Sequence, residues 1–314
     1  MKKIAILAPN KEFFGATIVQ FPFFQSLRSA YPDAEIKVWS SVKISNILKT
    51  YSLCDEVTSI EKNGFFPFLI SLLKFSPDLI INMRPNSDRT LLCTFLTPAR
   101  KKIWFSKKKK HKGVFQNTQI YIAYSYLELL GPLGVRQDRN FELFSQLIKT
   151  SGYVIQQSKK NIVFIVAGGE RYKRWGIDNF LRLIEILGPS HFFYHFVLGA
   201  DEQDYIKSIN EKNLPFFEIH SGKKIEDIGK LCISSDLVVS NDCGPSHIAQ
   251  LSHCRYLSLW GWGLKPLFPR FSEWFYPHND SYVLMTKHGV ELPELEPERV
   301  AKMCLGLINH NEVK

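Results

Sequence analysis

The sequence predicts an α/β protein of two doubly wound domains, on the basis of three observations. Short apolar segments alternate along the chain with amphipathic stretches of helical length. The apolar segments are continuous runs of Val, Ile, Leu and Phe, which is typical of parallel strands covered on both faces. The scheme occurs on both sides of a polar stretch at 149–161, which we interpret as a linker. The predicted domains are therefore residues 1–150 and 151–314.

In the first domain, a strand leads through a loop containing Gly15 into a helical stretch. Pro22 lies inside this stretch, so the helix either kinks there or starts late. The strands expected in this domain are 3–8, 35–40, 56–60, 78–83 and 102–106.

The second domain ends in a predicted helix at 297–309, which we expect to pack back on the first domain. Ligands of doubly wound sheets bind outside the carboxyl ends of the strands, so two such domains facing each other would form a binding cleft. The strands expected in the second domain are 161–167, 192–199, 216–220, 236–240 and 255–260.

The composition excludes several classes of protein. Hydrophobic residues make up 45% of the chain, which excludes a disordered protein. Every apolar run is too short to cross a bilayer, and the apolar part of "MKKIAILAPNKEF" is too short for a signal peptide. The six cysteines form no C-x-x-C pair, which favours reduced thiols in a cytoplasmic protein over disulfides or zinc.

The chain is basic, with 40 Lys and Arg against 30 Asp and Glu. Part of the excess lies in "RKKIWFSKKKKHK", residues 100–112, which contains no acidic residue. Such a run can meet nucleic acid, an anionic membrane surface or a phosphorylated substrate, or it can be a solvated loop.

The stretch "SNDCGPSHIAQ", residues 240–250, joins the end of an apolar strand to a helix. Gly244 allows a tight turn, and Pro245 suits the first position of a helix. The N–H groups beyond it favour an anion, with His247 in the first turn, while Asp242 can accept hydrogen bonds from hydroxyl groups. The pattern therefore indicates a phosphate beside a polyol, as in a nucleotide sugar. The alternative is a capped helix with an incidental histidine.

The stretch "VAGGERYKRWG", residues 166–176, runs from a strand into Gly168 and Gly169 and then to Lys173. It lacks the G-x-x-x-x-G-K-[ST] pattern of a P-loop. A glycine turn followed by a lysine can still bind a diphosphate through the ammonium charge. The alternative is the solvated start of a helix.

These two stretches, together with "FPFFQSLRSAYPDAEIKV" and "SPDLIIN", resemble glycosyltransferase family 9, the bacterial lipopolysaccharide heptosyltransferases. The resemblance covers most of the chain. It implies a GT-B fold, in which two Rossmann-like domains face a cleft and the second holds the donor. It also implies an inverting, metal-independent transfer without a cofactor. The implied donor is ADP-heptose and the implied acceptor a phosphorylated lipid A–core glycolipid.

Carried over by residue, the resemblance implies a donor site. Lys173 falls on the position that meets the donor phosphates, and either Asp201 or Glu202 falls where an acid binds the ribose. The loop "WGWG", residues 260–263, replaces the family's "FGPT". The other implied donor-binding residues are Gly168, Gly169, Asp242, Cys243, Gly244 and His247. Cys243 replaces the usual Ser or Thr, and Lys173 and His247 are expected to stabilise the charge of the leaving diphosphate.

One position departs from the family pattern. The family usually has Gly-Asp in the first loop, with the Asp as the expected base, whereas this chain has Gly15-Ala16. Alanine cannot accept a proton. Either Glu12 or Asp88 replaces the base, or catalysis is impaired. The resemblance also assigns Lys107, Lys108, Lys109 and Lys110 to the acceptor or to the inner face of the cytoplasmic membrane, and it implies no nucleic-acid partner.

Two further functions remain open from the sequence. Ala16 permits a nucleotide-sugar-binding protein without turnover, and the same fold permits a nucleotide-sugar epimerase. A Rossmann dehydrogenase is disfavoured because no G-x-G-x-x-G follows any predicted strand.

Overall fold

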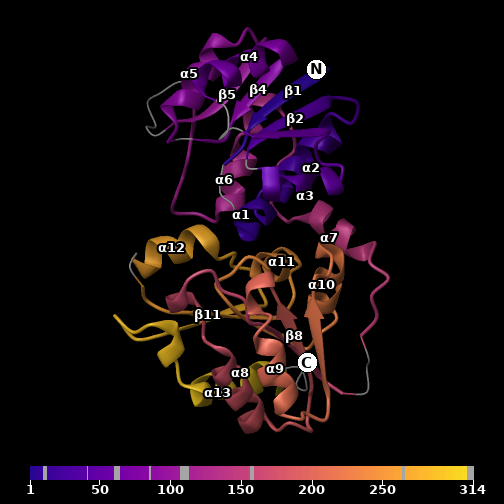
Figure 1. Ribbon diagram of the computed structural model, residues 1–314, viewed down its shortest axis with the longest axis vertical. Helices are drawn as coiled ribbons and strands as arrows, with labels where there is room; N and C mark the ends of the chain where they lie inside the picture. The colour runs from indigo at the N-terminus through magenta and orange to yellow at the C-terminus, as the bar shows by residue number, and fades with distance from the viewer. Residues whose placement is uncertain are drawn as a thin grey trace. The chain divides into compact units, whose positions relative to one another are not determined.

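The computed structural model describes residues 1–9, 13–40, 42–59, 64–84, 86–106, 113–155, 159–263 and 266–309. The chain divides into two compact units, Met1–Phe144 and Ser145–Lys314 (Figure 1). We predicted the boundary after residue 150, which is six residues beyond the division after Phe144. Helix α7 (Glu142–Lys149) spans the division between the units.

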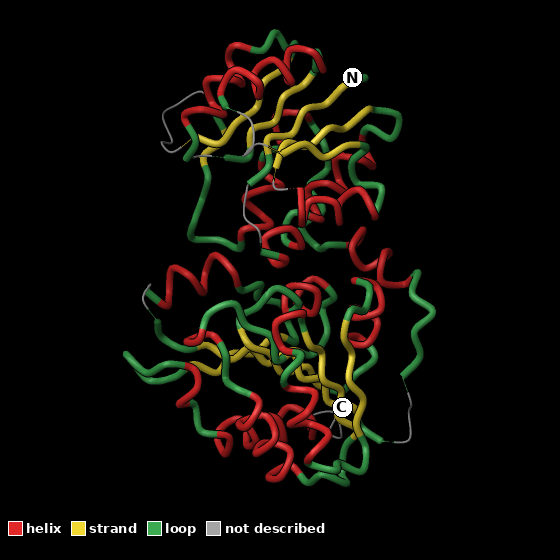
Figure 2. Tube along the Cα trace, viewed as in Figure 1, coloured by secondary structure: helices red, strands yellow, loops and turns green. Residues whose placement is uncertain are grey.

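The first unit contains a six-stranded parallel sheet with the order β3-β2-β1-β4-β5-β6. Helices cover both of its faces (Figure 2). Pro22 lies in the first turn of α2, so that helix starts late rather than kinking. The strands are β1 (Lys3–Leu7), β2 (Glu35–Ser40), β3 (Glu56–Ser59), β4 (Leu79–Asn82), β5 (Lys101–Ser106) and β6 (Val114–Phe115). The helices before α7 are α1 (Phe14–Ile18), α2 (Phe21–Ala30), α3 (Val42–Thr50), α4 (Phe65–Phe75), α5 (Asp88–Leu96), α6 (Ile122–Glu128) and the 3-10 turn η1 (Gly131–Leu133).

The second unit contains a second six-stranded parallel sheet, ordered β12-β11-β10-β7-β8-β9. Its strands are β7 (Asn161–Ile165), β8 (Phe193–Leu198), β9 (Phe217–Ser221), β10 (Leu237–Asn241), β11 (Tyr256–Trp260) and β12 (Ser281–Met285). Its helices are α8 (Ile177–Leu187), α9 (Tyr205–Glu211), α10 (Ile225–Ile233), α11 (Ser246–Leu251), α12 (Leu267–Trp274) and α13 (Pro297–Asn309), with 3-10 turns η2 (Arg171–Lys173), η3 (Ala200–Glu202) and η4 (Leu292–Glu294).

The two sheets have the same topology. Counted from the first strand of each unit, both have the order 3-2-1-4-5-6 of a doubly wound nucleotide-binding sheet. An aspartate before the fourth strand ties it to the first strand in each unit. Asp78 Oδ2 accepts the backbone N–H of Lys3 at 3.2 Å, and Asp236 Oδ2 accepts that of Asn161 at 2.8 Å. The predicted pair of doubly wound α/β sheets is therefore confirmed.

All ten predicted strands are present, each within two residues of its expected bounds at either end. The sequence analysis missed β6 and β12, the last strand of each sheet. β6 has only two residues, and β12 is half-buried along its length, so neither has the continuous apolar pattern of a central strand.

The last helix, α13, lies at its predicted position, and its buried face packs inside the second unit. Its buried side chains, among them Val300, Cys304 and Ile308, belong to the core of the second unit. That core lies between the sheet and the helix pair α8 and α13, which contact each other. The apolar face of α13 is thus used within its own unit.

Two further expectations concern the cysteines and the presence of membrane-spanning helices. All six cysteines lie in the described ranges, and each is buried and free of a disulfide. No helix in those ranges has the length and apolar character that crossing a membrane requires.

Candidate functional site

Three charged side chains meet beyond the carboxyl end of β10. Asp242 follows β10, Lys173 ends η2, and Arg270 lies in α12. Asp242 Oδ2 lies 3.5 Å from Lys173 Nζ and 3.4 Å from Arg270 Nε. Asp242 and Arg270 are each only 8% exposed, so the charges interact in a largely desolvated setting. The structure therefore brings together Lys173 and Asp242, which lie about 70 residues apart in the sequence.

Asn241, the last residue of β10, positions the segment that carries Lys173. Its Nδ2 donates to the backbone oxygens of Val166 and Ala167, at 2.9 and 3.2 Å. Its Oδ1 accepts the backbone N–H of Trp175 at 3.3 Å. Asn241 is fully buried, so these bonds form away from water. One side chain thus fixes both ends of the segment between β7 and α8.

Arg270 is held by two aromatic rings and one carbonyl. Its guanidinium lies 5.1 Å from the ring centre of Tyr172 and 5.3 Å from that of Trp260. Its Nη2 donates to the backbone oxygen of Gly261 at 2.7 Å. Its Nη1 is buried and has no hydrogen-bond partner among the described residues, whereas its Nε faces Asp242 Oδ2 at 3.4 Å. A buried N–H donor without a partner is costly, so Nη1 is suited to an incoming anion.

Sequence reasoning missed Arg270 because its partners come from separate loops. The sequence contains only a weak signal for Arg270. It is the single cation in the α12 segment "LFPRFSEW", which is otherwise mainly apolar. A lone arginine in such a helix is either buried with partners or directed to solvent, and the sequence does not distinguish the two.

The second acidic group near Lys173 is Glu170. Its Oε2 lies 3.7 Å from Lys173 Nζ, and its side chain is 59% exposed. The hydroxyl of Tyr172 donates a short hydrogen bond to the same carboxylate. Because Glu170 is largely solvated, its carboxylate attracts the Lys173 ammonium less strongly than the buried carboxylate of Asp242 does.

Burial dominates the protonation of the two titratable residues that the sequence singled out. Burial raises the pKa of the Asp242 carboxyl, while the charges of Lys173 and Arg270 lower it. Burial and, to a smaller extent, the nearby Lys173 charge lower the pKa of His247 to about 3. His247 is therefore neutral at pH 7.

The hydrogen bonds around His247 determine which ring nitrogen carries its proton. The backbone N–H of Tyr276 donates to Gln250 Oε1 at 2.7 Å, which turns the Nε2 amide group of Gln250 toward His247 Nδ1 at 3.3 Å. Nδ1 is then an acceptor, and Nε2 carries the hydrogen. His247 is therefore a neutral ring and does not supply a positive charge.

Glu202 is already engaged by the backbone. Its Oε1 accepts the N–H of Gly168 at 3.3 Å and its Oε2 that of Gly199 at 3.0 Å. The side chain is 3% exposed, so it ties the loop after β7 to the loop after β8. Asp201 beside it is exposed. Of the two carboxylates predicted for the ribose, Asp201 is the more accessible to a ligand.

The family of the chain can now be stated from comparison with known proteins. The model of glycosyltransferase family 9 (heptosyltransferase) matches residues 78–302, which contain Lys173, Asp242, His247 and Arg270. The chain belongs to glycosyltransferase family 9. It is thus a glycosyltransferase, as the sequence predicted. No curated protein matches it.

Solved structures agree with the family 9 assignment. A family 9 glycosyltransferase from Veillonella parvula DSM 2008 is 18% identical, with a TM-score of 0.67 over 98% of each chain. The ADP-heptose LPS heptosyltransferase II of E. coli is 16% identical, with a TM-score of 0.65 over 99% of this chain and all of that one. E. coli heptosyltransferase WaaC with ADP is 14% identical, with a TM-score of 0.70 over 97% and 99%. These likenesses establish the GT-B fold.

The family 9 signature after β10 takes a local form that differs slightly from expectation. Helix α11 begins at Ser246, so Pro245 is its cap residue rather than its first helical residue. The hydroxyl of Ser246 donates to the backbone oxygen of Cys243 at 2.7 Å, which closes the turn around Gly244. Burial raises the pKa of Cys243 to about 12, so the thiol is neutral. Where family 9 has a hydroxyl, this chain has an uncharged, buried sulfur.

The two glycines of the "AGG" turn have different roles. A Cβ atom on Gly168 would lie 2.6 Å from Arg174 Cγ, because Arg174 folds back to donate a short hydrogen bond to the Gly168 oxygen. A Cβ on Gly169 would meet nothing within 4 Å. Gly168 is therefore required by packing inside the protein, whereas Gly169 borders open space.

The glycines of the loop "WGWG" allow close packing next to the aromatic rings that contact Arg270. A Cβ on Gly261 would lie 2.1 Å from the backbone nitrogen of Leu292. A Cβ on Gly263 would lie 2.3 Å from the ring of Tyr172. Gly263 thus lets Tyr172 occupy its place beside Arg270. This loop, which replaces the family's "FGPT", acts here through close packing.

The predicted base and acceptor residues belong to the first unit. Ala16 is buried in α1, and Asp88 is exposed in the first turn of α5. Glu12 and the four lysines Lys107, Lys108, Lys109 and Lys110 lie outside the described residues. Of the two carboxylates proposed to replace the missing family 9 base, the structure describes Asp88.

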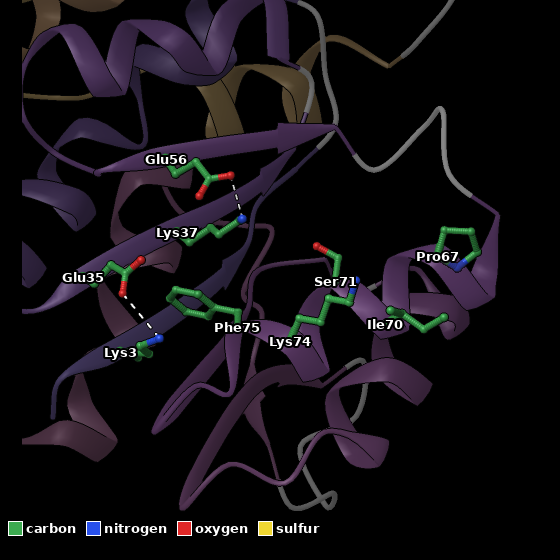
Figure 3. Close-up of a pocket in the computed structure, with 9 residues that line it drawn as sticks. All are labelled: Lys3, Glu35, Lys37, Glu56, Pro67, Ile70, Ser71, Lys74 and Phe75. Atoms are coloured by element: carbon green, nitrogen blue, oxygen red, sulfur yellow. Dashed lines mark ion pairs between the residues drawn. The ribbon is translucent and has the colours of Figure 1, made fainter.

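The first unit also has a surface hollow that is separate from any such site (Figure 3). It lies at the amino ends of the first strands, beside α4. Four of its charged residues form two ion pairs, with Lys3 Nζ 3.7 Å from Glu35 Oε2 and Lys37 Nζ 2.6 Å from Glu56 Oε1. Ligands of doubly wound sheets bind at the opposite, carboxyl ends. We therefore do not assign this hollow to the donor or the acceptor.

Replacing Asn241 by Ala should weaken ligand binding although Asn241 carries no charge. The change removes three buried hydrogen bonds and frees the segment that carries Lys173. We expect a loss of about 1–3 kcal/mol in the free energy of unfolding and a clear loss of ADP affinity. Urea denaturation and calorimetric titration with ADP measure the two effects.

The control for Asn241→Ala is Thr94→Ala. Thr94 is buried in the first unit, where its hydroxyl donates to the Thr90 oxygen at 2.7 Å. This variant should lose stability while retaining its ADP affinity. Unchanged ADP affinity in Asn241→Ala would contradict the positioning role.

Proposed function

We propose that the protein is an inverting glycosyltransferase that transfers heptose from ADP-heptose to a phosphorylated glycolipid of the lipopolysaccharide core. The observation that carries this proposal is the buried cluster of Lys173, Asp242 and Arg270 at the carboxyl end of β10. Family 9 membership gives the reaction type. The choice of donor rests on neighbours of the same fold, among them E. coli WaaC with ADP-2-deoxy-2-fluoro heptose, with a TM-score of 0.67.

In this proposal, the cluster stabilises the leaving diphosphate. The charge on ADP grows as the bond to the anomeric carbon breaks, and preorganised cations near that charge lower the barrier. Lys173 supplies a point charge, and Arg270 supplies its guanidinium charge and the Nη1 donor. His247 is neutral, so it adds no positive charge to the cluster. Two fixed cations provide the electrostatic role that a metal ion has in other transferases, so the proposed transfer is metal-independent.

Asp242 has two roles in this proposal. Its carboxylate holds the two cations in place before the donor arrives, and it can accept hydrogen bonds from sugar hydroxyls. Asp201 is the proposed partner of the ribose hydroxyls. Gly169, which borders open space, allows a ligand to approach the backbone closely.

The acceptor hydroxyl needs a base. In an inverting transfer, the acceptor oxygen attacks the anomeric carbon while its proton passes to a carboxylate and the diphosphate leaves. Ala16 cannot accept that proton. We propose that Asp88 or Glu12 does. The second candidate function, a donor-binding protein without turnover, is favoured by Ala16 alone.

The proposed acceptor is a membrane glycolipid, and the first unit has a surface suited to a membrane. Helices α4 and α5 contact each other and expose large apolar side chains, including Phe66 at 72% and Phe95 at 49%. The other exposed apolar residues of this α4–α5 face are Ile70, Leu73, Leu92 and Leu96. Basic residues adjoin it in the sequence, from Arg100 through the four lysines. Apolar side chains beside basic ones favour an anionic bilayer surface, so we propose a peripheral location on the inner face of the cytoplasmic membrane.

The donor site is tested by removing its cations one at a time. Lys173→Ala and Arg270→Gln should each weaken ADP binding by about 1.5–3 kcal/mol, or roughly 10- to 150-fold, since each loses a charge-assisted contact with a phosphate. Calorimetry with ADP and ADP-heptose measures this loss. Lys207→Ala, which removes an exposed cation from α9, is the control. Wild-type ADP affinity in both site variants would exclude this assignment.

The base is tested by exchanging carboxylates. If Asp88 or Glu12 has replaced the usual base, Asp88→Asn or Glu12→Gln should lower the transfer rate about 10²–10⁴-fold while ADP binding survives. Ala16→Asp should then be neutral or harmful. If no replacement exists, Ala16→Asp should raise turnover with little change in donor affinity. ADP release in the presence of acceptor gives the rate. Insensitivity to all three changes would show that the base lies elsewhere or that the reaction is not glycosyl transfer.

The α4–α5 face is tested with lipid vesicles. Phe66→Ser combined with Phe95→Ser should reduce co-sedimentation with anionic vesicles about tenfold or more. Each change removes apolar area that binding would bury in the bilayer surface, worth on the order of 1 kcal/mol. Val154→Ser, at an 83% exposed apolar residue of the second unit, is the matched control. Equal vesicle binding by all three proteins would contradict a membrane role for this face.

A further inference from the structure

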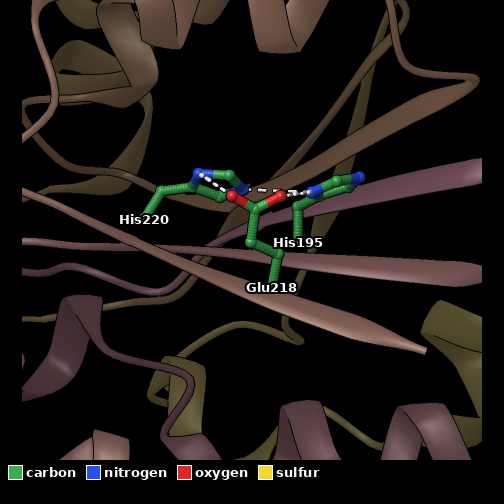
Figure 4. Close-up of side chains that lie close together, drawn as sticks. All are labelled: His195, Glu218 and His220. Atoms are coloured by element: carbon green, nitrogen blue, oxygen red, sulfur yellow. Dashed lines mark hydrogen bonds and ion pairs between the residues drawn. The ribbon is translucent and has the colours of Figure 1, made fainter. Parts of the chain in front are cut away.

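A cluster of two histidines and a glutamate lies between β8 and β9 of the second unit, apart from the proposed donor residues (Figure 4). His195 of β8 lies opposite Glu218 of β9, and His220 follows two residues later on the same face of β9. Both histidines are 1% exposed. The Glu218 side chain is 44% exposed and faces both rings. The cluster is thus closed on the protein side and open toward Glu218.

Asn161 determines the tautomer of His195. Asn161 Nδ2 donates to the backbone oxygen of Lys159 at 2.8 Å, so its Oδ1 faces His195 Nε2 at 2.9 Å. His195 Nε2 must then carry the hydrogen, and Nδ1 has a lone pair. A histidine that donates one N–H to an oxygen and directs the other nitrogen inward is in the usual state of a metal ligand.

The lone pair of His195 Nδ1 faces His220. His220 Nε2 lies 3.0 Å from it, and His220 Nδ1 lies 3.6 Å from Glu218 Oε1. If neutral His220 donates from Nε2, its Nδ1 lone pair faces an anionic carboxylate, which is unfavourable. A cation bound between His195 Nδ1 and His220 Nε2 removes this conflict, because the His220 hydrogen can then lie on Nδ1, facing Glu218.

The spacing fits an ion bound by both rings. With metal–nitrogen bonds of about 2.0–2.1 Å, a 3.0 Å separation of the nitrogens corresponds to an N–metal–N angle of about 95°. Glu218 Oε2 lies 3.9 Å from His195 Nδ1 and accepts from the Tyr153 hydroxyl at 3.3 Å. Because Glu218 is nearly half-exposed, its carboxylate can move the short distance needed to complete the set.

We propose that His195 Nδ1, His220 Nε2 and a Glu218 oxygen bind one divalent first-row transition metal ion, of the zinc or iron(II) class. Two imidazoles and one carboxylate are a ligand set that such ions prefer. On binding, the proton of neutral His220 passes from Nε2 to Nδ1, where it faces Glu218 Oε1, so no net proton is released. Water completes the coordination on the open side.

The role of this ion is structural. β9 is the edge strand of its sheet, and the ligands join it to β8. Tyr153, which precedes β7, reaches the same site through Glu218. The ion would therefore link the edge strand β9 to β8 and, through Glu218, to the segment around Tyr153 that precedes β7. This proposal is independent of the transfer reaction and of its base.

Titration of the tag-free, chelator-stripped full chain with Co²⁺ and Zn²⁺ tests the proposal. We expect one ion per chain by calorimetry, a visible absorption band for Co²⁺ and a higher melting temperature. Glu218→Gln should weaken binding at least about tenfold, and His220→Asn should do the same. Glu211→Gln, which removes an exposed carboxylate of α9, should bind as the wild type does.

Three results would overturn the proposal: no bound ion, binding that neither site variant weakens, or binding that Glu211→Gln weakens equally. The first would leave the two rings as a hydrogen-bonded neutral pair. If His220→Asn fails to fold by circular dichroism, Glu218→Gln decides alone, because its half-exposed side chain is replaced by one of the same size.

Discussion

The bonds of the Asn241 amide anchor the segment that carries Lys173 to the central strand β10. Lys173, Asp242 and Arg270 come from three separate loops, and buried charges are favourable only when their geometry is fixed. Asn241 belongs to a central strand, so its position is set by the sheet itself. Through three hydrogen bonds it transfers that rigidity to the segment between β7 and α8. Lys173 and Asp242 are therefore both positioned by the central strand β10. Such preorganisation is what a site for a developing negative charge requires.

The central strands could be predicted because the physics that forms them is local. A strand covered by helices on both faces must be apolar at every position, and this pattern is visible in "NIVFIVA" and "DLVVS" without any knowledge of tertiary contacts. The last strand of each sheet is not under this constraint. β6 and β12 are only half-buried, and no comparable apolar pattern marks them in the sequence. The packing of α13 on α8 depends on which apolar face fits which partner, and one sequence does not contain that information.

The candidate site was predictable in outline for a related reason. Residues at the carboxyl ends of β7 and β10 share one edge of the sheet, so Lys173 and Asp242 could be placed together from strand positions alone. Arg270 comes from a helix after a different strand and required coordinates. His247 and Glu202 were identified by residue type, yet their bonding differs from what their type indicates. Burial makes His247 neutral, and two backbone N–H groups engage Glu202.

The aspartates that begin the fourth strands have a consequence for how the chain assembles. Asp78 and Asp236 each bond to a residue 75 positions earlier in the sequence. Closing a loop of that length costs about 4 kcal/mol of chain entropy, plus a constant, and the cost is the same in both sheets. All residues of the first closure precede the first residue of the second. During synthesis, the amino-terminal sheet can thus join its two central strands before β7 has left the ribosome. The two sheets have loop-closure costs of equal size and can form one after the other. The strands of one sheet therefore do not compete with those of the other for pairing partners.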